Sequence, residues 1–173
     1  WRGAAVRMPG SVYDDAGQKW GLEPAIIRAV FAVESAGRPF RADGTVERRY
    51  EPHHMPGSGI TNWRDSLKMT TAAREAAFAR AYAQNPEAAL RATSWGGPQI
   101  MGFNHAAAGY PSARDMVEAM AGREQAHLDA FLTLISGWGL ITTLRAHDWR
   151  GFATRYNGSG QAGVYAARIE KAY

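Results

Sequence analysis

The stretch Pro24-Ala-Ile-Ile-Arg-Ala-Val-Phe-Ala-Val-Glu-Ser-Ala-Gly37 has the pattern of an amphipathic helix that ends in a carboxylate. Proline near its start and glycine after its end predict a helix over residues 24–35. The apolar stripe includes Val30 and Phe31, and Glu34 lies four and three residues after them, so it shares their face. The stretch therefore predicts a core helix that carries an acidic side chain on its buried side.

Two effects act on the carboxyl of Glu34. Burial disfavours its charged form, and the negative end of the helix dipole does the same in the last turn. Both raise the pKa, as a general acid working near neutral pH requires. A Glu paired with a nearby Arg at the helix end is an equally good interpretation of the pattern alone.

A second carboxylate, Glu51, ends the only extended segment that we predict, Thr45–Glu51, which we interpret as half of a small hairpin. Two carboxylates in different environments are the usual equipment for glycoside hydrolysis. Composition alone favours a solvated strand-end residue at this position. Glu47 is an alternative candidate for the second carboxylate, but the charged residues beside it indicate that its side chain is exposed to solvent.

The glycines, prolines and helix-capping residues in the rest of the chain predict short helices and hence a mainly α domain with one small β element. Thr93–Gly102, which holds three glycines and a proline, is predicted as a loop or a broken helix start. The other predicted helices are 12–20 capped by Ser11, 71–84, 86–92 opened by Asn85, a long helix from Ser112 to Ile135, 140–147, 148–155 and 163–173.

Several polar and aromatic side chains are candidates for contacting a polar ligand. In the segment 93–102, Gln99 offers an amide and Trp95 a flat apolar face, and its glycines allow a close approach of the backbone. The Tyr156-Asn157 pair suits the lining of a sugar-binding groove. The alternative for the segment 93–102 is a tight turn that merely packs, and Asn157 and Gly158 suit a turn on their own account.

The histidines do not form a recognisable metal site. His53 and His54 are adjacent but lack third and fourth ligands at a typical spacing, so we predict no metal and no cofactor. A hydrogen-bonding or substrate-contact role remains open for His53.

Composition bounds the class of protein. The 173 residues are enough for one domain with a real core, and 46% hydrophobic and 21% charged residues are ordinary for a globular protein. No apolar run approaches the about 20 residues of a membrane span, and cysteine is absent. The net charge of +4 comes from dispersed arginines, which disfavours a nucleic-acid binder.

Three blocks together resemble the signatures of goose-type lysozymes and lytic transglycosylases. They are Ala32-Val-Glu34-Ser-Ala-Gly37, Ser94-Trp-Gly-Gly-Pro-Gln-Ile-Met-Gly102 and Tyr156-Asn-Gly158. With Arg49-Tyr-Glu-Pro-His-His54 and Arg145-Ala-His-Asp-Trp149, the chain is more similar still to the N-acetylmuramidases that form catalytic domains of bacteriophage endolysins. Gly97-Pro98 departs from this pattern, where two larger residues are expected.

The resemblance implies a lysozyme-like α fold with one small β-hairpin beside the active-site cleft. It implies cleavage of the β-1,4 bond between N-acetylmuramic acid and N-acetylglucosamine, with Glu34 as the catalytic acid and Glu51 acting on water. The expected substrate contacts are His53, Trp95, Gln99, Met101, Tyr156 and Asn157.

The resemblance also implies a domain organisation, an oligomeric state and a place of action. Residues 1–173 are expected to be a single catalytic domain, with excision from a longer modular protein as an alternative to a free-standing chain. It would be a monomer made in the host cytoplasm, act on bacterial peptidoglycan and neither bind nucleic acid nor insert into a membrane. The alternatives are a lytic transglycosylase that uses Glu34 alone, a basic nucleic-acid-binding helical domain and a non-catalytic wall-binding module.

Overall fold

The predicted core helix is helix α2 (Pro24–Ser35) in a computed structural model that describes residues 1–173. Proline occupies its first turn, and the helix ends where Ala36 takes a left-handed conformation with φ of 53°. Ile26, Ile27 and Val30 are fully buried, as the apolar stripe predicts. The stripe packs this helix into the centre of the domain.

The fold is mainly α, as expected, with ten α-helices, two short 3-10 helices and three short strands. The 3-10 helices are η1 (Pro52–His54) and η2 (Gly102–Asn104). The other α-helices are α1 (Ser11–Trp20), α3 (Trp63–Leu67), α4 (Thr71–Gln84), α5 (Pro86–Arg91), α6 (Ala113–Gly122), α7 (Glu124–Gly137), α8 (Leu140–Arg145), α9 (Trp149–Tyr156) and α10 (Ala162–Ala172).

The sheet is larger than predicted. Strands β1 (Arg48–Tyr50), β2 (Thr93–Trp95) and β3 (Ile100–Met101) form one antiparallel sheet in that order. The prediction of a loop or helix start over residues 93–102 is therefore wrong, because these residues form the hairpin of β2 and β3. The extended segment before Glu51 joins the edge of that hairpin through Arg48–Tyr50, and its Val46 also forms the predicted small local hairpin, as an antiparallel bridge with Phe40.

Glycines at the turn of the hairpin explain how it fits the core. Gly96 has φ of +73°, and a Cβ there would lie 2.3 Å from Nδ1 of His127. A Cβ on Gly97 would lie 2.8 Å from the ring of Phe31. Larger side chains are therefore excluded on steric grounds at these two positions, and this accounts for the glycine that departs from the family pattern.

The long helix predicted from Ser112 to Ile135 is two helices, α6 and α7. Arg123 between them is extended and forms a bridge with Val6, and the backbone N–H of Glu124 donates to the Val6 carbonyl at 2.8 Å. The amino-terminal segment thus pairs with the chain at the break. Local periodicity could not show this, because the pairing joins residues more than 110 positions apart. The predicted cap of α1 also differs, since Gly10 and not Ser11 precedes its first turn.

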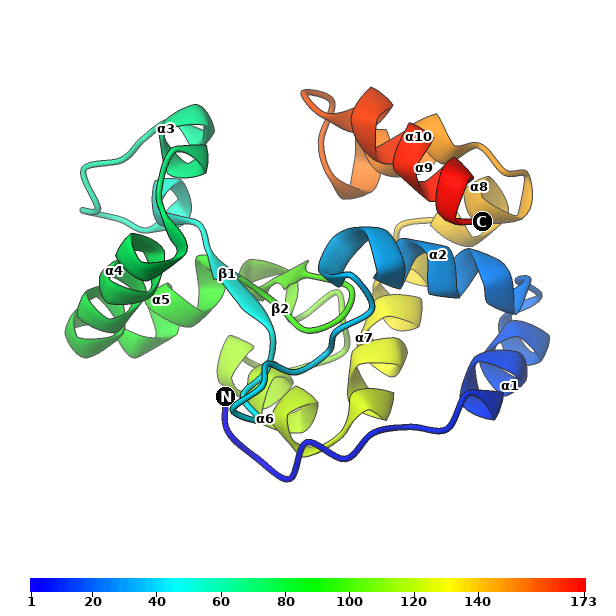
Figure 1. The fold of residues 1–173 in the computed structure, drawn as a ribbon, viewed down its shortest axis with the longest axis horizontal. Coiled ribbons are helices and arrows are strands. Elements are labelled where there is room, and N and C mark those ends of the chain that lie inside the picture. Colours follow the sequence, from blue (N-terminus) through cyan, green and yellow to red (C-terminus); the bar gives the residue numbers. More distant parts are fainter.

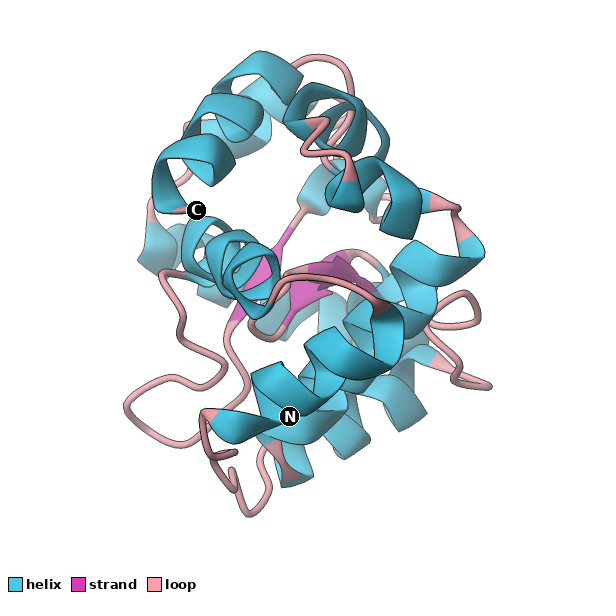
Figure 2. Cartoon of the chain, turned by 90° about the vertical axis from the view of Figure 1, so that its right-hand side faces the viewer, coloured by secondary structure: helices cyan, strands magenta, loops and turns pink.

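The sheet lies between two groups of helices. Figure 1 shows α3, α4 and α5 on one side of β1 and β2, with α2, α7 and α8 to α10 on the other. Figure 2 shows the strands near the middle, with helices around them. A cluster of 34 buried hydrophobic residues, including Phe131 of α7, joins these parts. No helix combines the length and apolar character needed to cross a bilayer.

Candidate active site

Glu34 lies in the last turn of α2, and its carboxyl has no cationic partner. Its Oε1 atom accepts a hydrogen bond of 2.7 Å from Nδ2 of Asn157. Burial raises the pKa of Glu34 to about 7, although the Asn157 hydrogen bond lowers it. The alternative in which Glu34 pairs with an Arg at the helix end is therefore wrong. The side chain can hold a proton near neutral pH.

The residues after α9 position the partner of Glu34. Asn157 caps the carboxyl end of α9, and its own Oδ1 is buried without a hydrogen-bond partner. The neighbouring Tyr156 donates its hydroxyl to the Pro98 carbonyl at 2.8 Å and stacks on Phe152. Tyr156 thus joins α9 to the turn between β2 and β3.

Glu51 lies immediately after β1 and is held from several directions. One carboxylate oxygen accepts from Nε of Arg49 at 2.6 Å, and the other accepts from Oγ of Ser66 at 2.8 Å. Nη1 of Arg74 lies 3.5 Å from the second oxygen. The side chain is only 16% exposed. These contacts hold the carboxylate in one place and compensate its charge.

Arg74 is a site residue that the sequence reasoning missed. Its buried guanidinium donates to the Tyr50 carbonyl at 2.6 Å and to Oγ of Ser66 at 3.0 Å, besides its contact with Glu51. It therefore ties α4 to β1 and α3. A signal was present, because Arg74 lies four residues before the buried Phe78 and shares the inner face of α4. A buried Arg needs acceptors, and here a carboxylate is one of them.

His53 lies beside Glu51, with Nδ1 3.7 Å from a carboxylate oxygen and without a hydrogen bond. Burial lowers the pKa of His53, so the ring is neutral at neutral pH. The His53 ring lies 4.1 Å from that of His54, and the His54 ring contacts Phe103 edge to face at 5.1 Å. Phe103, 39% exposed and also missed by the sequence reasoning, extends this row of rings away from Glu51.

The β2–β3 hairpin supplies one exposed side chain and one structural amide. Met101 is half-buried and opposite Ser94, which is opposite Arg49, so the three share a face of the sheet. Gln99 accepts from Oγ of Ser94 at 2.9 Å and donates to the Gly96 carbonyl at 2.8 Å. Both ends of its amide are therefore occupied within the hairpin.

Trp95 is not available to a ligand. Its side chain is fully buried, and its indole N–H donates to the Leu90 carbonyl at 2.9 Å. The ring packs near Trp1 and Phe78 in the core. The expectation that Trp95 offers a flat face to a substrate is wrong, because strand alternation turns it away from the face that carries Arg49.

Tyr165 of α10 links the two carboxyls electrostatically. Burial raises the pKa of its phenol, and the charges of Glu34 and Glu51 raise it further, while Arg49 lowers it. The phenol is therefore within electrostatic range of both carboxyls. Figure 1 shows α10 lying across α2, which accounts for this position. The site thus combines a carboxyl that holds its proton with a second carboxylate bound by cations.

No group of three or more His, Cys, Asp or Glu side chains has an arrangement that could hold a metal ion.

Comparison with known proteins points to one family. Residues 54–173 match the model of the Muramidase family, described as N-acetylmuramidase, and the match begins three positions after Glu51. A solved structure, the crystal structure of the Burkholderia AP3 phage endolysin, matches with a TM-score of 0.77 and 32% sequence identity. The alignment covers 96% of this chain and 69% of that one. No curated protein matches the chain.

Proposed function

The chain belongs to the N-acetylmuramidase family, and from this premise we propose that Glu34 and Glu51 are the pair that cleaves its substrate. The enzyme is a glycoside hydrolase that acts on peptidoglycan. The bond that we assign is the β-1,4 linkage between N-acetylmuramic acid and N-acetylglucosamine. The observation that carries the assignment is the carboxyl of Glu34, which belongs to a half-buried residue, pairs with no cation and has its pKa raised to about 7 by desolvation.

In the proposed reaction, the protonated carboxyl of Glu34 gives its proton to the glycosidic oxygen as the bond breaks. Positive charge then develops at C1 and the ring oxygen of the muramic acid residue. The Glu51 carboxylate orients a water molecule on the opposite face of the sugar and accepts its proton. Glu34 is left ionised and takes up a proton from solvent, while Glu51 releases to solvent the proton that it accepted. Water added from the face opposite the leaving group inverts the configuration at C1.

The other candidate residues divide into two roles under this proposal. Met101, His53 and Asn157, which are each half-buried, contact the glycan. Gln99 and Tyr156 act as positioning residues, because the hydrogen bonds of their side chains lie within the chain. Residues 1–173 act as a single catalytic domain and as a monomer.

The charge distribution supports a glycan rather than a nucleic acid as the polymer that is bound. Of the arginines near β1, Arg41 and Arg48 pair with Glu75, and Arg49 pairs with Glu51. Paired arginines have less positive charge to offer to phosphates, whose binding depends on free cations.

Product analysis tests the reaction type. Digestion of purified sacculi should give reducing-end muramic acid that has gained one water, because Glu51 activates water. A lytic transglycosylase, which uses no water, gives 1,6-anhydro products lighter by that water. Mass spectrometry of the fragments distinguishes the two, and NMR of the fresh reducing ends reports inversion or retention. Anhydro products throughout would contradict the role of Glu51.

The pH dependence tests the proton on Glu34. Activity should fall as pH rises through about 7, because the acid then loses its proton. The hydrogen bond from Asn157 favours the ionised form, so Asn157→Ala should raise the pKa of Glu34 and move this alkaline limb to higher pH. The measurement is kcat/KM on soluble wall fragments across pH. Gln18→Ala, which removes an exposed amide on α1, is the control. A limb that stays in place or moves to lower pH contradicts the assignment.

A further inference from the structure

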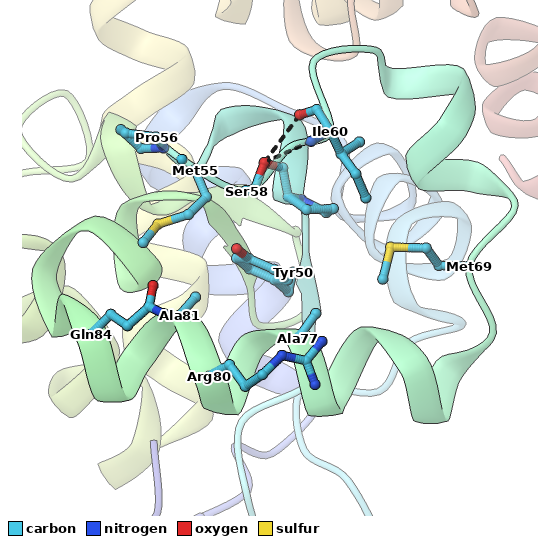
Figure 3. A pocket seen from close by; sticks show the side chains of 12 residues that line it. Tyr50, Met55, Pro56, Ser58, Ile60, Met69, Ala77, Arg80, Ala81 and Gln84 are labelled. Atoms are coloured by element: carbon cyan, nitrogen blue, oxygen red, sulfur yellow. Dashed lines mark hydrogen bonds between the residues drawn. The ribbon is translucent and has the colours of Figure 1, made fainter.

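A pocket of about 230 Å³ lies on the other side of β1 from Glu51. Figure 3 shows it between β1, the loop of residues 55–60 and helix α4, with Tyr50 at its centre. Met55, Ile60 and Met69 form apolar walls. Ligand pockets for whole drug-sized molecules are larger, about 300–1,000 Å³, so this volume suits the end of a chain.

Tyr50 places an unpaired hydrogen-bond donor in the pocket. The residue is 2% exposed, and its hydroxyl, which solvent reaches, has no hydrogen-bond partner in the chain. In Figure 3 the hydroxyl points into the space between the loop and α4, toward the side of Met55 and Gln84. A hydroxyl that solvent reaches can exchange a water partner for a ligand group that accepts its hydrogen bond.

Arg80 adds a positive charge to the same pocket. It lies on the α4 wall near Tyr50 and has neither an ion pair nor a side-chain hydrogen bond. Arg74, one and a half turns earlier on the same helix, is saturated with acceptors by contrast. The amide of Gln84 lines the pocket one turn after Arg80. The site thus offers a phenol, a guanidinium and an amide beside apolar walls, which matches a carboxylate attached to small apolar groups.

We propose that this pocket binds the free carboxylate end of a short, alanine-rich peptide, namely the peptide branch that peptidoglycan carries on its muramic acid residues. The proposal rests on the proposed function for the choice of polymer. The carboxylate accepts from Tyr50 and Arg80, and the methyl groups contact Met55, Ile60 and Met69. The enzyme would then hold its substrate at two places, the glycan at the carboxyls and a peptide end behind β1.

The position of the pocket suits this role. Tyr50 and Glu51 are consecutive, so the pocket and the proposed base lie on opposite faces of one short segment. A branch of about four or five extended residues spans roughly 14–17 Å, which is long enough to reach from one face of a single strand to the other. A hold on the peptide would therefore favour glycan that still carries its branches.

Direct binding tests the pocket without any hydrolysis. The probes are N-acetyl-D-alanyl-D-alanine and its carboxy-terminal amide, titrated into the whole chain while the methyl signals of Met55 and Met69 are followed by NMR. We expect the acid to shift both signals and the amide to bind at least about tenfold more weakly. Arg80→Gln and Tyr50→Phe should each weaken binding of the acid by about tenfold. Arg150→Gln, at an exposed and unpaired arginine on α9, should change nothing.

Hydrolysis then separates this proposal from the proposed function. Arg80→Gln should slow cleavage of intact sacculi at low substrate concentration and leave cleavage of peptide-free glycan strands unchanged. The pocket proposal is overturned if the acid and the amide bind with equal affinity or if neither binds. It is also overturned if Arg80→Gln changes the cleavage rates of intact sacculi and of peptide-free glycan by the same factor. Failure of the wild type to cleave either substrate contradicts the proposed function instead, and the dipeptide titration still reports on the pocket.

Discussion

Replacing Glu34 by Gln should reduce hydrolysis of purified peptidoglycan by at least about a hundredfold while the fold stays intact. Glutamine keeps the shape of the side chain and its place beside Asn157, but it has no proton to give to the leaving oxygen. The burial that raises the pKa of Glu34 is what makes this carboxyl useful near neutral pH. The measurement is the rate of release of new reducing ends.

Glu170→Gln is the matched control, since Glu170 is an exposed carboxyl on α10. It makes the same replacement of a carboxyl by an amide at an exposed position and should keep full activity. Retention of more than about a hundredth of wild-type activity in Glu34→Gln would mean that a smaller contribution than that of a general acid has been lost, and the assignment would be wrong.

Thermal stability gives Glu34→Gln a second readout that does not depend on substrate. The pKa of Glu34 is about 7 in the folded chain against an ordinary value of 4.5, so the folded state holds this proton more tightly than the unfolded state does. Its contribution to stability is complete below 4.5 and is lost as pH rises to about 7. The variant, which lacks this titration, should therefore gain stability relative to wild type across that window.

Replacing Glu51 by Gln should have the second largest effect, a loss of about a hundredfold or more in hydrolysis. The amide cannot accept a proton from water. It also leaves the guanidiniums of Arg49 and Arg74 without their carboxylate, so some loss of stability is expected. Activity must therefore be compared at a temperature where circular dichroism shows both proteins folded.

Ser66→Ala is the control for this second variant. It removes one hydrogen bond to the Glu51 carboxylate but keeps the charge and both arginines, so its loss of activity should be much smaller. The identity of the released products gives a second readout. The water-activating role is contradicted if Glu51→Gln retains more than about a tenth of the activity. It is also contradicted if the variant releases anhydro products as fast as the wild type releases its hydrolysed products.

Local signals were sufficient for several helices. Proline in the first turn located the start of α2, and the asparagine before Pro86 located α5, whose first turn donates a backbone hydrogen bond to that side chain. Residues 71–84 are helical as predicted. In each case the deciding interaction joins residues within four positions of one another, so the sequence pattern contains it.

The sheet and the break between α6 and α7 could not be predicted in the same way. Glycines in the segment 93–102 suggested a loop, yet two of them are required because His127 and Phe31 fill the space that side chains would need. The bridge between Val6 and Arg123 interrupts a regular apolar pattern. These features depend on partners far away in the sequence, which local propensity does not contain.

The sequence by itself determined that α2 buries its apolar stripe and brings Glu34 inward, because helical periodicity places every fourth residue on one face. It also determined that Glu51 follows a strand. Only the tertiary structure decided that Glu34 is free of arginine and bonded to Asn157, whereas Glu51 is held by Arg49, Ser66 and Arg74. The proton affinity of a carboxyl depends on its solvent and its charged neighbours, and folding brings these from distant parts of the chain.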